Sequence, residues 1–295
     1  MAFLLLPFAF VYYLLSRIVY LCKKLHSYKS NRPVVCFGGL LAGGVGKTPI
    51  VRAVAKYFDA PVVMRGYKKT AKTDGIGDEA KMLAESGLAV HVGNRKSNVI
   101  LLNRQSDEAP IIMDDGLQNP SVHKDVSVLV FDEYIGFGNG FLLPAGPLRE
   151  PKCHARRADA IIVIRNKKPK KNFTLPTNVP LFYAENKTVS PYSNGERLFA
   201  FAGIGYPKKF FDSLPGVVGK KSFADHYQYT DRDVKKLFAI AEKYNAKLVT
   251  THKDWVRLPD YARDKIKFAR LETTLDGKFF EWLKERLNAN TKKES

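Results

Sequence analysis

The sequence predicts an α/β fold: a parallel sheet with helices on both faces, together with a second, smaller α/β lobe. Two observations lead to this prediction. Short apolar runs alternate with helical patterns along most of the 295 residues, and this alternation is typical of a parallel sheet covered by helices. In addition, one of the apolar runs leads into a glycine-rich turn that ends in Gly-Lys-Thr at 46–48.

The chain opens with an uncharged apolar segment. Residues 1–16 contain no charged side chain, and basic residues follow from Arg17 onward. The run is shorter than the ~20 residues that a full membrane span needs, and Pro7 disturbs a regular helix. We therefore expect a membrane-associated helix at 1–26 that lies on the bilayer or inserts shallowly. The alternative is a helix packed on the core of the domain.

The glycine-rich turn follows a predicted buried strand at 34–37 and precedes a helical pattern. This is the context of a phosphate-binding loop, because backbone N–H groups can surround an anion where a helix begins. Lys47 would reach the terminal phosphates and Thr48 would place its hydroxyl on Mg²⁺. An ordinary glycine turn is the alternative, since Leu41 stands where the usual pattern begins with glycine. The residues expected to bind the nucleotide are Leu41, Ala42, Gly43, Gly44, Val45, Gly46, Lys47 and Thr48.

The alternation continues to residue 165 and defines a core at 27–165. Further strands are predicted at 60–64, 88–91, 109–113, 126–131 and 160–164, and helices at 77–86 and 96–104. A basic, proline-containing stretch at 166–196 predicts a connection between lobes, with short hairpin strands. The smaller lobe is expected at 197–288, with strands at 198–202, 217–223, 247–250 and 267–271 and helices at 207–213, 231–244 and 275–287. Thr230 is the expected cap of the helix at 231–244, and the polar tail 289–295 is expected to fray.

Acidic pairs follow two of the predicted strands. Asp114 and Asp115 come after the strand at 109–113, and Asp132 with Glu133 follows the strand at 126–131. Ligands of parallel sheets bind beyond the carboxyl ends of the strands, where such acids can hold Mg²⁺. We favour Asp114 and Asp115 because a glycine turn follows them, and Asp132 with Glu133 is the competing pair. Either pair can also be a solvated loop.

Other polar residues at the predicted strand and helix ends have two interpretations each. Asp78 begins a helix, where a carboxylate either complements the helix dipole or serves as a general base. Arg65 and Arg95 follow strands, and each is either a cation at the phosphate-binding edge or a surface charge. His226 ends a strand beside Asp225, although a lone histidine is more often structural.

The composition limits the classes of partner. A formal charge of +19 favours nucleic acid, an anionic membrane surface or phosphorylated substrates. The basic stretch at 165–171 lacks interleaved aromatic residues, which counts against single-stranded nucleic acid. Cys22, Cys36 and Cys153 have no metal-ligand spacing and are expected to be free thiols.

Taken together in order, the motifs resemble those of the tetraacyldisaccharide 4′-kinase family, the lipid A 4′-kinases. The resemblance covers nearly the whole chain. The chain departs from the family's usual pattern at Gly39, Leu41, Lys68, Asn119 and His252. The matching motifs are the N-terminal apolar helix, 43–49, 65–67, 77–79, 114–118, 137–140, 143–150, 201–205, 225–226 and 250–254.

The resemblance implies a fold similar to P-loop NTPases with a second lobe, and transfer of the ATP γ-phosphate to the 4′-hydroxyl of a lipid A disaccharide 1-phosphate with Mg²⁺. By resemblance Asp78 is the base, assisted by His226, and Lys47 and Arg95 act on the phosphates. The implied metal-binding residues are Thr48, Asp114, Asp115 and Glu150. The residues implied near the nucleotide or substrate are Arg65, Tyr67, Gln118 and Arg149.

The same resemblance implies an anionic glycolipid substrate at the cytoplasmic face of a bacterial inner membrane, with no nucleic acid and no obligate protein partner. Two other classes remain open. One is a P-loop NTPase switch or metallochaperone acting on a protein partner, although the segment 250–254 matches a guanine-reading box only loosely, and this mismatch and the apolar N-terminus count against that class. A nucleic-acid-binding ATPase would fit the positive charge alone.

Overall fold

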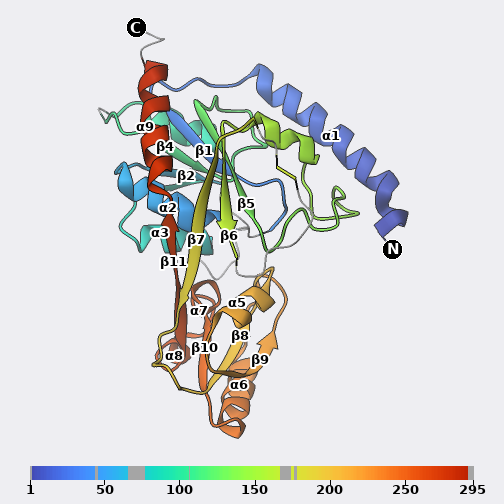
Figure 1. Ribbon diagram of the computed structural model, residues 1–295, viewed down its shortest axis with the longest axis vertical. Coiled ribbons are helices and arrows are strands. Elements are labelled where there is room, and N and C mark those ends of the chain that lie inside the picture. The colour runs from blue at the N-terminus through green and yellow to red at the C-terminus, as the bar shows by residue number, and fades with distance from the viewer. Residues whose placement is uncertain are drawn as a thin grey trace. The chain divides into compact units, whose positions relative to one another are not determined.

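The computed structural model describes residues 2–43, 46–65, 77–105, 107–166, 174–175 and 178–291. The chain forms two compact units (Figure 1): the first comprises residues 1–185 and 274–295, and the second comprises residues 186–273. Both units contain parallel strands with helices packed against them, which confirms the predicted α/β class.

In the first unit the strands lie parallel in the order β3-β2-β4-β1-β5-β6-β7. Their bounds are β1 Val34–Gly38, β2 Val62–Met64, β3 Val90–Val92, β4 Ile111–Asp114, β5 Val126–Asp132, β6 Ala160–Arg165 and β7 Leu181–Val189. The helices are η1 Ala2–Leu5, α1 Leu6–Leu25, α2 Lys47–Tyr57, α3 Asp78–Ala84, α4 Arg95–Leu102, η2 Lys152–Arg157 and α9 Gly277–Thr291. Because β4 is hydrogen-bonded to β1, with Phe37 opposite Asp114, the segments that follow these two strands begin side by side.

Alternate residues of β1 point to opposite faces of the sheet, and each face has its own core. Val35 and Phe37 pack in a cluster that includes apolar residues of α2, α3 and α9. Val34 and Cys36 pack in a second cluster with α4. All four of these strand residues are fully buried, as expected when helices cover both faces of a parallel sheet.

The second unit has the strand order β11-β10-β8-β9, again with parallel pairs. Its elements are β8 Leu198–Ala202, α5 Pro207–Ser213, β9 Val217–Ser222, α6 Asp231–Lys243, β10 Lys247–Thr251, α7 His252–Trp255, α8 Asp260–Arg263 and β11 Lys267–Leu275. Thr230 caps α6 as predicted, and it forms a reciprocal capping box with Asp233. The two short helices after β10 were not anticipated by the sequence pattern.

The boundaries of the two units differ from those expected from the sequence. The expected connection at 166–196 contains β7, a single nine-residue strand along which the chain enters the second unit. The expected smaller lobe at 197–288 ends earlier, because residues from Thr274 onward belong to the first unit. The reason is the apolar face of α9, whose Phe279, Leu283 and Leu287 are buried in the core of the first unit.

Phe279 provides a test of this assignment. Its ring is fully buried and lies 5.3 Å from that of Phe182 and 6.2 Å from that of Phe37. We expect Phe279→Ala to destabilise the first unit by about 3–5 kcal/mol, the usual cost of removing a buried phenyl ring. Trp282 lies in the same cluster, so urea unfolding monitored by its fluorescence in a Trp255→Phe background would report on this unit. The matched change at partly buried Phe280 should cost less, and equal costs would contradict the assignment.

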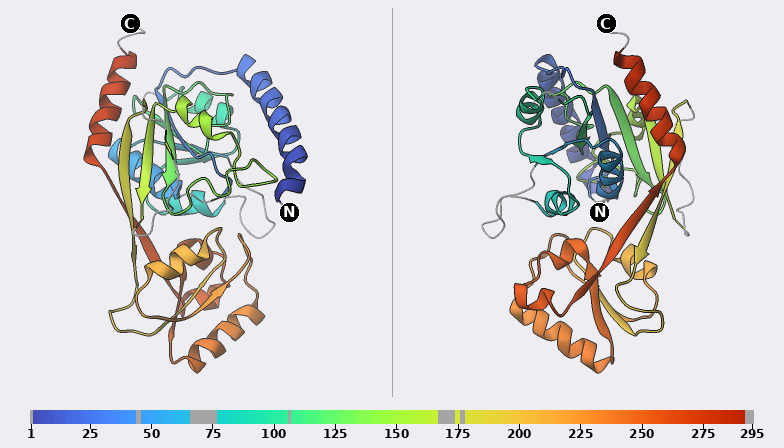
Figure 2. Two further views of the ribbon diagram at one scale, coloured as in Figure 1. Left: turned by 45° about the vertical axis from the view of Figure 1, so that its right-hand side comes forward. Right: turned by 90° about the vertical axis from the view of Figure 1, so that its left-hand side faces the viewer.

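Helix α1 is not a core helix. Ala9 is its one buried residue among those described, and the helix with η1 is long and apolar enough to cross a membrane, by length and composition alone. Both η1 and α1 contact the rest of the first unit: the ring of Phe3 in η1 lies 5.7 Å from that of Phe141, and the Arg157 guanidinium lies 5.8 Å from the ring of Tyr20 in α1. The outer face of α1 is apolar and exposed, and it includes Phe10, Val11, Leu14, Leu15, Ile18 and Val19. Figure 2 shows α1 along one side of the first unit, away from α9.

Candidate functional site

The glycine-rich turn follows β1 and ends where α2 begins. Gly43 and Gly46 have positive φ angles of 109° and 77°, in the left-handed region that glycine adopts most readily. Lys47 and Thr48 form the first turn of α2 and are buried. The expected nucleotide-binding residues Gly44 and Val45 lie outside the described residues. The arrangement of strand, glycine turn and helix is therefore the one that the sequence predicts.

The first part of this turn is attached to the segment that precedes η2. Leu41 forms an isolated bridge with Leu148, and the Ala42 N–H donates to the Pro147 carbonyl oxygen at 2.7 Å. The Arg149 N–H donates to the carbonyl oxygen of Leu40 at 2.7 Å. The Ala42 N–H therefore already has a hydrogen-bond acceptor within the protein. A residue that binds phosphate through its backbone would instead need a free N–H, so this differs from the expectation for Ala42. The same contacts bring Arg149 beside the turn.

Asp115 joins the two segments through ion pairs. Its carboxylate lies 3.0 Å from Lys47 Nζ and 2.8 Å from an Arg149 guanidinium nitrogen. Burial by itself raises the pKa of Asp115, but the charges of Lys47 and Arg149 outweigh burial and lower the pKa to about 2. Asp115 also has a positive φ of 52°, which is uncommon for a residue other than glycine. Lys47 and the predicted acidic pair therefore belong to one cluster.

Asp114 has the opposite electrostatic environment. Its side chain is 2% exposed, and its Oδ1 has no hydrogen-bond partner in the part of the chain that the structure describes. Burial, followed by the charge of Glu79, raises the pKa of Asp114 to about 7, despite the nearby Lys47 and Arg95. A buried carboxylate oxygen without a donor, beside a second carboxylate, is chemically suited to a cation.

The residues present fit Mg²⁺ in particular. Within the described ranges there is no group of three or more His, Cys, Asp or Glu side chains that could hold a metal by themselves. Mg²⁺ usually takes only one or two protein carboxylates and completes its shell with water and substrate phosphates. The unpartnered oxygen of Asp114, close to the start of α2 where phosphates would bind, meets that requirement.

Asp114 should make stability depend on pH in a defined window. Since its pKa rises from the ordinary 3.8 to about 7 on folding, the native state keeps a proton that the unfolded chain loses in that range. Stability therefore falls as pH rises from about 4 to 7 and levels off above it. Asp114→Asn cannot ionise, so its unfolding free energy relative to the wild type should increase across this window and then stay constant. Denaturant unfolding with chelator present measures the difference, and a flat difference would contradict the shifted pKa.

Arg95 is buried at the start of α4 and holds the backbone of the acidic pair. Its guanidinium donates to the carbonyl oxygens of Asp114 at 3.0 Å and Asp115 at 2.9 Å. Burial lowers the pKa of Arg95, and the charge of Arg65 acts in the same direction. Arg65 itself directly follows β2 and is exposed. Arg95 is therefore well placed to orient the carboxylates, a role that the sequence pattern did not suggest.

The remaining predicted residues of the first unit are distributed around this cluster. The Gln118 side-chain amide donates to the Gly39 carbonyl oxygen at 3.0 Å, which fixes the start of the glycine turn. Glu150 is buried and forms an ion pair with Arg157, and His154 Nδ1 lies 3.6 Å from its carboxylate. Asp78 is in the first turn of α3. Tyr67 lies outside the described residues.

The competing acidic pair is engaged locally. The backbone N–H of Tyr134 donates to Asp132 at 2.9 Å, and that of Asn166 donates to Glu133 at 3.1 Å. Both contacts hold the segment after β5 in place. Lys47 instead contacts Asp115, so the geometry favours the acidic pair at the end of β4.

His226 belongs to the second unit and is described with it. Its side chain is 59% exposed, and its backbone has a positive φ of 59°. The Arg257 guanidinium lies 3.4 Å from His226 Nδ1. Residues other than glycine are uncommon in this left-handed conformation, histidine being one of those that adopt it more often, and such residues concentrate at functional sites.

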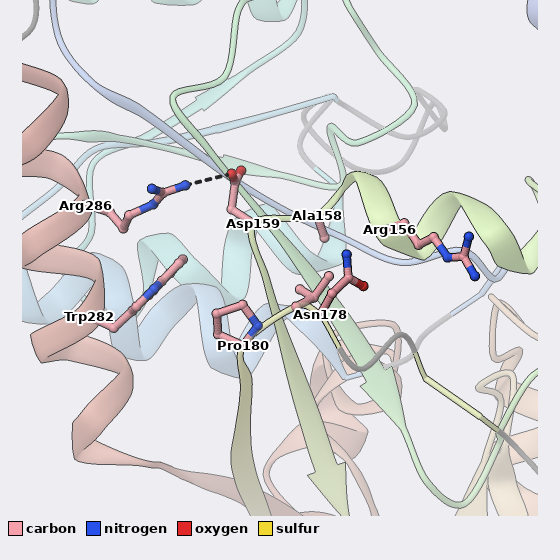
Figure 3. A pocket seen from close by; sticks show the side chains of 8 residues that line it. Arg156, Ala158, Asp159, Asn178, Pro180, Trp282 and Arg286 are labelled. Atoms are coloured by element: carbon pink, nitrogen blue, oxygen red, sulfur yellow. Dashed lines mark hydrogen bonds and ion pairs between the residues drawn. The ribbon is translucent and has the colours of Figure 1, made fainter.

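A cavity of about 330 Å³ lies elsewhere in the first unit. Figure 3 shows Arg286 of α9 directed at Asp159, at 3.2 Å, while Arg156 extends away from that pair. Asp159 and Pro180 immediately precede β6 and β7, so the cavity is at the amino ends of the strands. The glycine turn follows the carboxyl end of β1, and the cavity is therefore not part of the candidate site.

Sequence reasoning missed several partners of the predicted residues. Arg157 pairs with Glu150, and helical spacing gave no signal for this pair because Glu150 lies before the start of η2. Arg257 contacts His226, but the two residues are 31 positions apart in the chain, so no local pattern pointed to this pair. Tyr12 of α1 was not singled out from the sequence. Burial raises the pKa of Tyr12, the charge of Arg149 lowers it and the charge of Glu150 raises it.

Comparisons with known proteins show the family of this chain. Residues 1–288 match the family model described as LpxK, tetraacyldisaccharide-1-P 4′-kinase. Tetraacyldisaccharide 4′-kinases from Gluconobacter oxydans and Rickettsia typhi are 36% and 34% identical, over 91% and 93% of this chain and 88% and 91% of theirs. A crystal structure of LpxK from Aquifex aeolicus in complex with ATP superposes with a TM-score of 0.73 at 25% identity, covering 98% of each chain. The chain belongs to the tetraacyldisaccharide 4′-kinase family.

Proposed function

We propose that this chain transfers the γ-phosphate of ATP to the 4′-hydroxyl of tetraacyldisaccharide 1-phosphate, a step of lipid A biosynthesis. The observation that carries the proposal is the cluster of Lys47, Asp114 and Asp115 beside the glycine turn, in a chain of this family. Family membership does not favour a nucleotide switch or metallochaperone.

In the proposed reaction the sugar hydroxyl oxygen attacks the γ-phosphorus in line, and the bond to the β–γ bridging oxygen breaks to release ADP. Asp78 accepts the hydroxyl proton, and His226 assists Asp78. Lys47 and the amides of the glycine turn, at residues 43–48, hold the triphosphate. Positioning and charge neutralisation supply most of the rate in such reactions. Arg95 orients the carboxylates close to the reacting phosphates.

Mg²⁺ would be held by Thr48 and by the carboxylates of Asp114, Asp115 and Glu150, with no more than two of these carboxylates as direct ligands and the rest acting through bound water, and it would supply neutralisation of charge on the phosphate oxygens. In this conformation Asp115 is paired with Lys47 and Arg149, and Glu150 with Arg157. An incoming triphosphate would compete for Lys47 and Arg149, since phosphate is their alternative anionic partner. Lys47 then turns from Asp115 to the nucleotide, which frees a carboxylate oxygen for the metal. Arg65, Tyr67, Gln118 and Arg149 are proposed to contact nucleotide or glycolipid.

The decisive experiment is a transfer assay with γ-³²P-labelled ATP, the disaccharide 1-phosphate lipid and Mg²⁺. We expect label in the lipid and little label in inorganic phosphate. Omission of the lipid is the control. Label that appears only in inorganic phosphate, whether or not lipid is present, would reject the kinase proposal in favour of a hydrolytic switch.

We also propose that the outer face of α1 attaches the protein to the cytoplasmic face of the inner membrane, where ATP and the lipid substrate meet. The supporting observation is the set of exposed apolar side chains on that face, beside basic residues that anionic headgroups attract. Flotation with phosphatidylethanolamine–phosphatidylglycerol vesicles tests this. Leu15→Glu with Ile18→Glu should release the protein, whereas Leu101→Glu, at a similarly exposed leucine of α4, should not. If the α1 variant also stays bound to the vesicles, α1 does not attach the protein to the membrane.

A further inference from the structure

A buried hydrogen-bond network lies behind His226 in the second unit. Asp254 is fully buried, and its carboxylate accepts from the Gly203 N–H at 2.9 Å, the Tyr229 hydroxyl at 2.9 Å and the Thr251 hydroxyl at 2.6 Å. Burial, followed by the charge of Asp254, raises the pKa of Tyr229, which therefore remains a hydrogen-bond donor. A carboxylate with this many donors has a well-defined orientation.

Asp254 in turn orients Arg257. One guanidinium nitrogen of Arg257 lies 3.4 Å from the Asp254 carboxylate and donates to the Gly203 carbonyl oxygen at 3.1 Å. The same carbonyl accepts the backbone N–H of His226 at 3.1 Å. Gly203, Arg257 and His226 are therefore linked at both backbone and side chain. These residues are tightly packed, since even a Cβ added at Gly203 would lie only 3.1 Å from the Asp254 carboxylate.

The second terminal nitrogen of Arg257 points at the imidazole, 3.4 Å from His226 Nδ1. A guanidinium has only donors and stays protonated, so the imidazole nitrogen that faces it must be the acceptor. In a neutral imidazole the other nitrogen then carries the proton. On that side Asp225 Oδ1 lies 3.9 Å from Nε2, and a carboxylate also favours a proton there.

We propose that Arg257, held by Asp254, is a positioning residue that fixes His226 as a neutral imidazole with its proton on Nε2. His226 then acts only as a hydrogen-bond donor. It cannot take up the substrate proton, because a second proton on the ring would occupy Nδ1 and face the guanidinium. This inference rests on the proposed function: Asp78 alone receives the proton, and His226 contributes to the reaction only as a hydrogen-bond donor through Nε2–H.

The tautomer is measurable in the wild-type protein without any variant. The full-length chain labelled with ¹⁵N-histidine would be studied by long-range ¹H–¹⁵N correlation at about pH 8, where an ordinary imidazole is neutral. The His226 signals are assigned by their loss in His226→Gln. We expect Nε2 to show the shift of a protonated nitrogen and Nδ1 that of an acceptor. A protonated Nδ1 would overturn the proposal.

Variants connect the tautomer to the reaction. Arg257→Met removes the donor, so we expect a mixture of tautomers and a fall in kcat of about 10- to 100-fold, the size seen when the partner of an oriented histidine is lost. Arg263→Met is the matched control in the same unit, where Arg263 donates to the Val256 carbonyl oxygen. Unchanged tautomer and rate in Arg257→Met would overturn the proposal. If that variant is unstable, Arg257→Lys, which keeps a cationic donor, should preserve both.

Two isosteres of His226 test its role as a donor. The Gln amide places an N–H near the position of Nε2, and the Asn amide places one near Nδ1. Under the proposal His226→Gln retains more kinase activity than His226→Asn, and the reverse order contradicts it. Wild-type activity in both His226 variants would instead remove His226 from the reaction, which is a failure of the proposed function. The NMR measurement would still decide whether Arg257 sets the tautomer.

Discussion

Replacing Lys47 with alanine is expected to lower kcat on the order of 10³-fold, the loss that follows removal of one preorganised group that stabilises transition-state charge. Lys47 is buried at the start of α2 and contacts Asp115 at 3.0 Å. Its removal deletes the cation that would hold the terminal phosphates and also leaves Asp115 with Arg149 as its remaining ion-pair partner shown here. The lipid phosphorylation assay at saturating ATP measures the effect.

Lys56→Ala is the matched control for Lys47. Lys56 lies in the last turn of the same helix and is exposed, so the change removes a lysine from α2 without touching the cluster. We expect its kcat to match that of the wild type. A Lys47→Ala enzyme that keeps near-normal turnover, with ATP affinity unchanged, would mean that the glycine turn is not the phosphate site.

Replacing Asp78 with asparagine is expected to leave ATP affinity intact while kcat falls by about 10²- to 10⁴-fold, the contribution of a general base. Asp78 opens α3, where a carboxylate also complements the helix dipole. Asparagine keeps the shape of the side chain, so the structural part of the change is small. A fall in kcat without a loss of ATP affinity therefore distinguishes a general base from a residue with a purely structural role.

Glu85→Gln provides the comparison for Asp78, because Glu85 caps the other end of α3 and is exposed. That variant should show wild-type turnover and similar thermal stability. If Asp78→Asn retains most of its activity, Asp78 only stabilises the start of α3, and another residue accepts the proton. Measuring nucleotide binding by calorimetry in both variants confirms that the triphosphate site is undisturbed.

The acidic pair shows how neighbouring residues of the same type can be given different properties. Asp115 is held ionised by Lys47 and Arg149, whereas burial and Glu79 raise the pKa of Asp114 to about 7. One carboxylate is therefore the counter-ion of Lys47, which we propose to bind phosphate, and the other has an oxygen with no hydrogen-bond partner among the described residues, which suits a metal. Loss of the Asp114 proton and binding of a divalent cation should then be linked.

Much of this protein was determined by local patterns in its sequence. The strand before the glycine turn, the helix at Pro207–Ser213 and the Thr230 cap were all predicted because periodicity and capping act over a few neighbouring residues. The glycine turn and the acidic pair after β4 were predicted for the same reason. The motifs in their order also identified the family.

Tertiary structure alone decided which of these local features meet. The strand order places β4 beside β1 and so brings Asp115 to Lys47. Packing of an apolar helical face returned α9 to the first unit, although its sequence follows the second. The pairing of Arg257 with His226 likewise depends on contacts between segments far apart in the chain. Such contacts depend on how whole faces are buried against one another, and no short window of sequence contains that information.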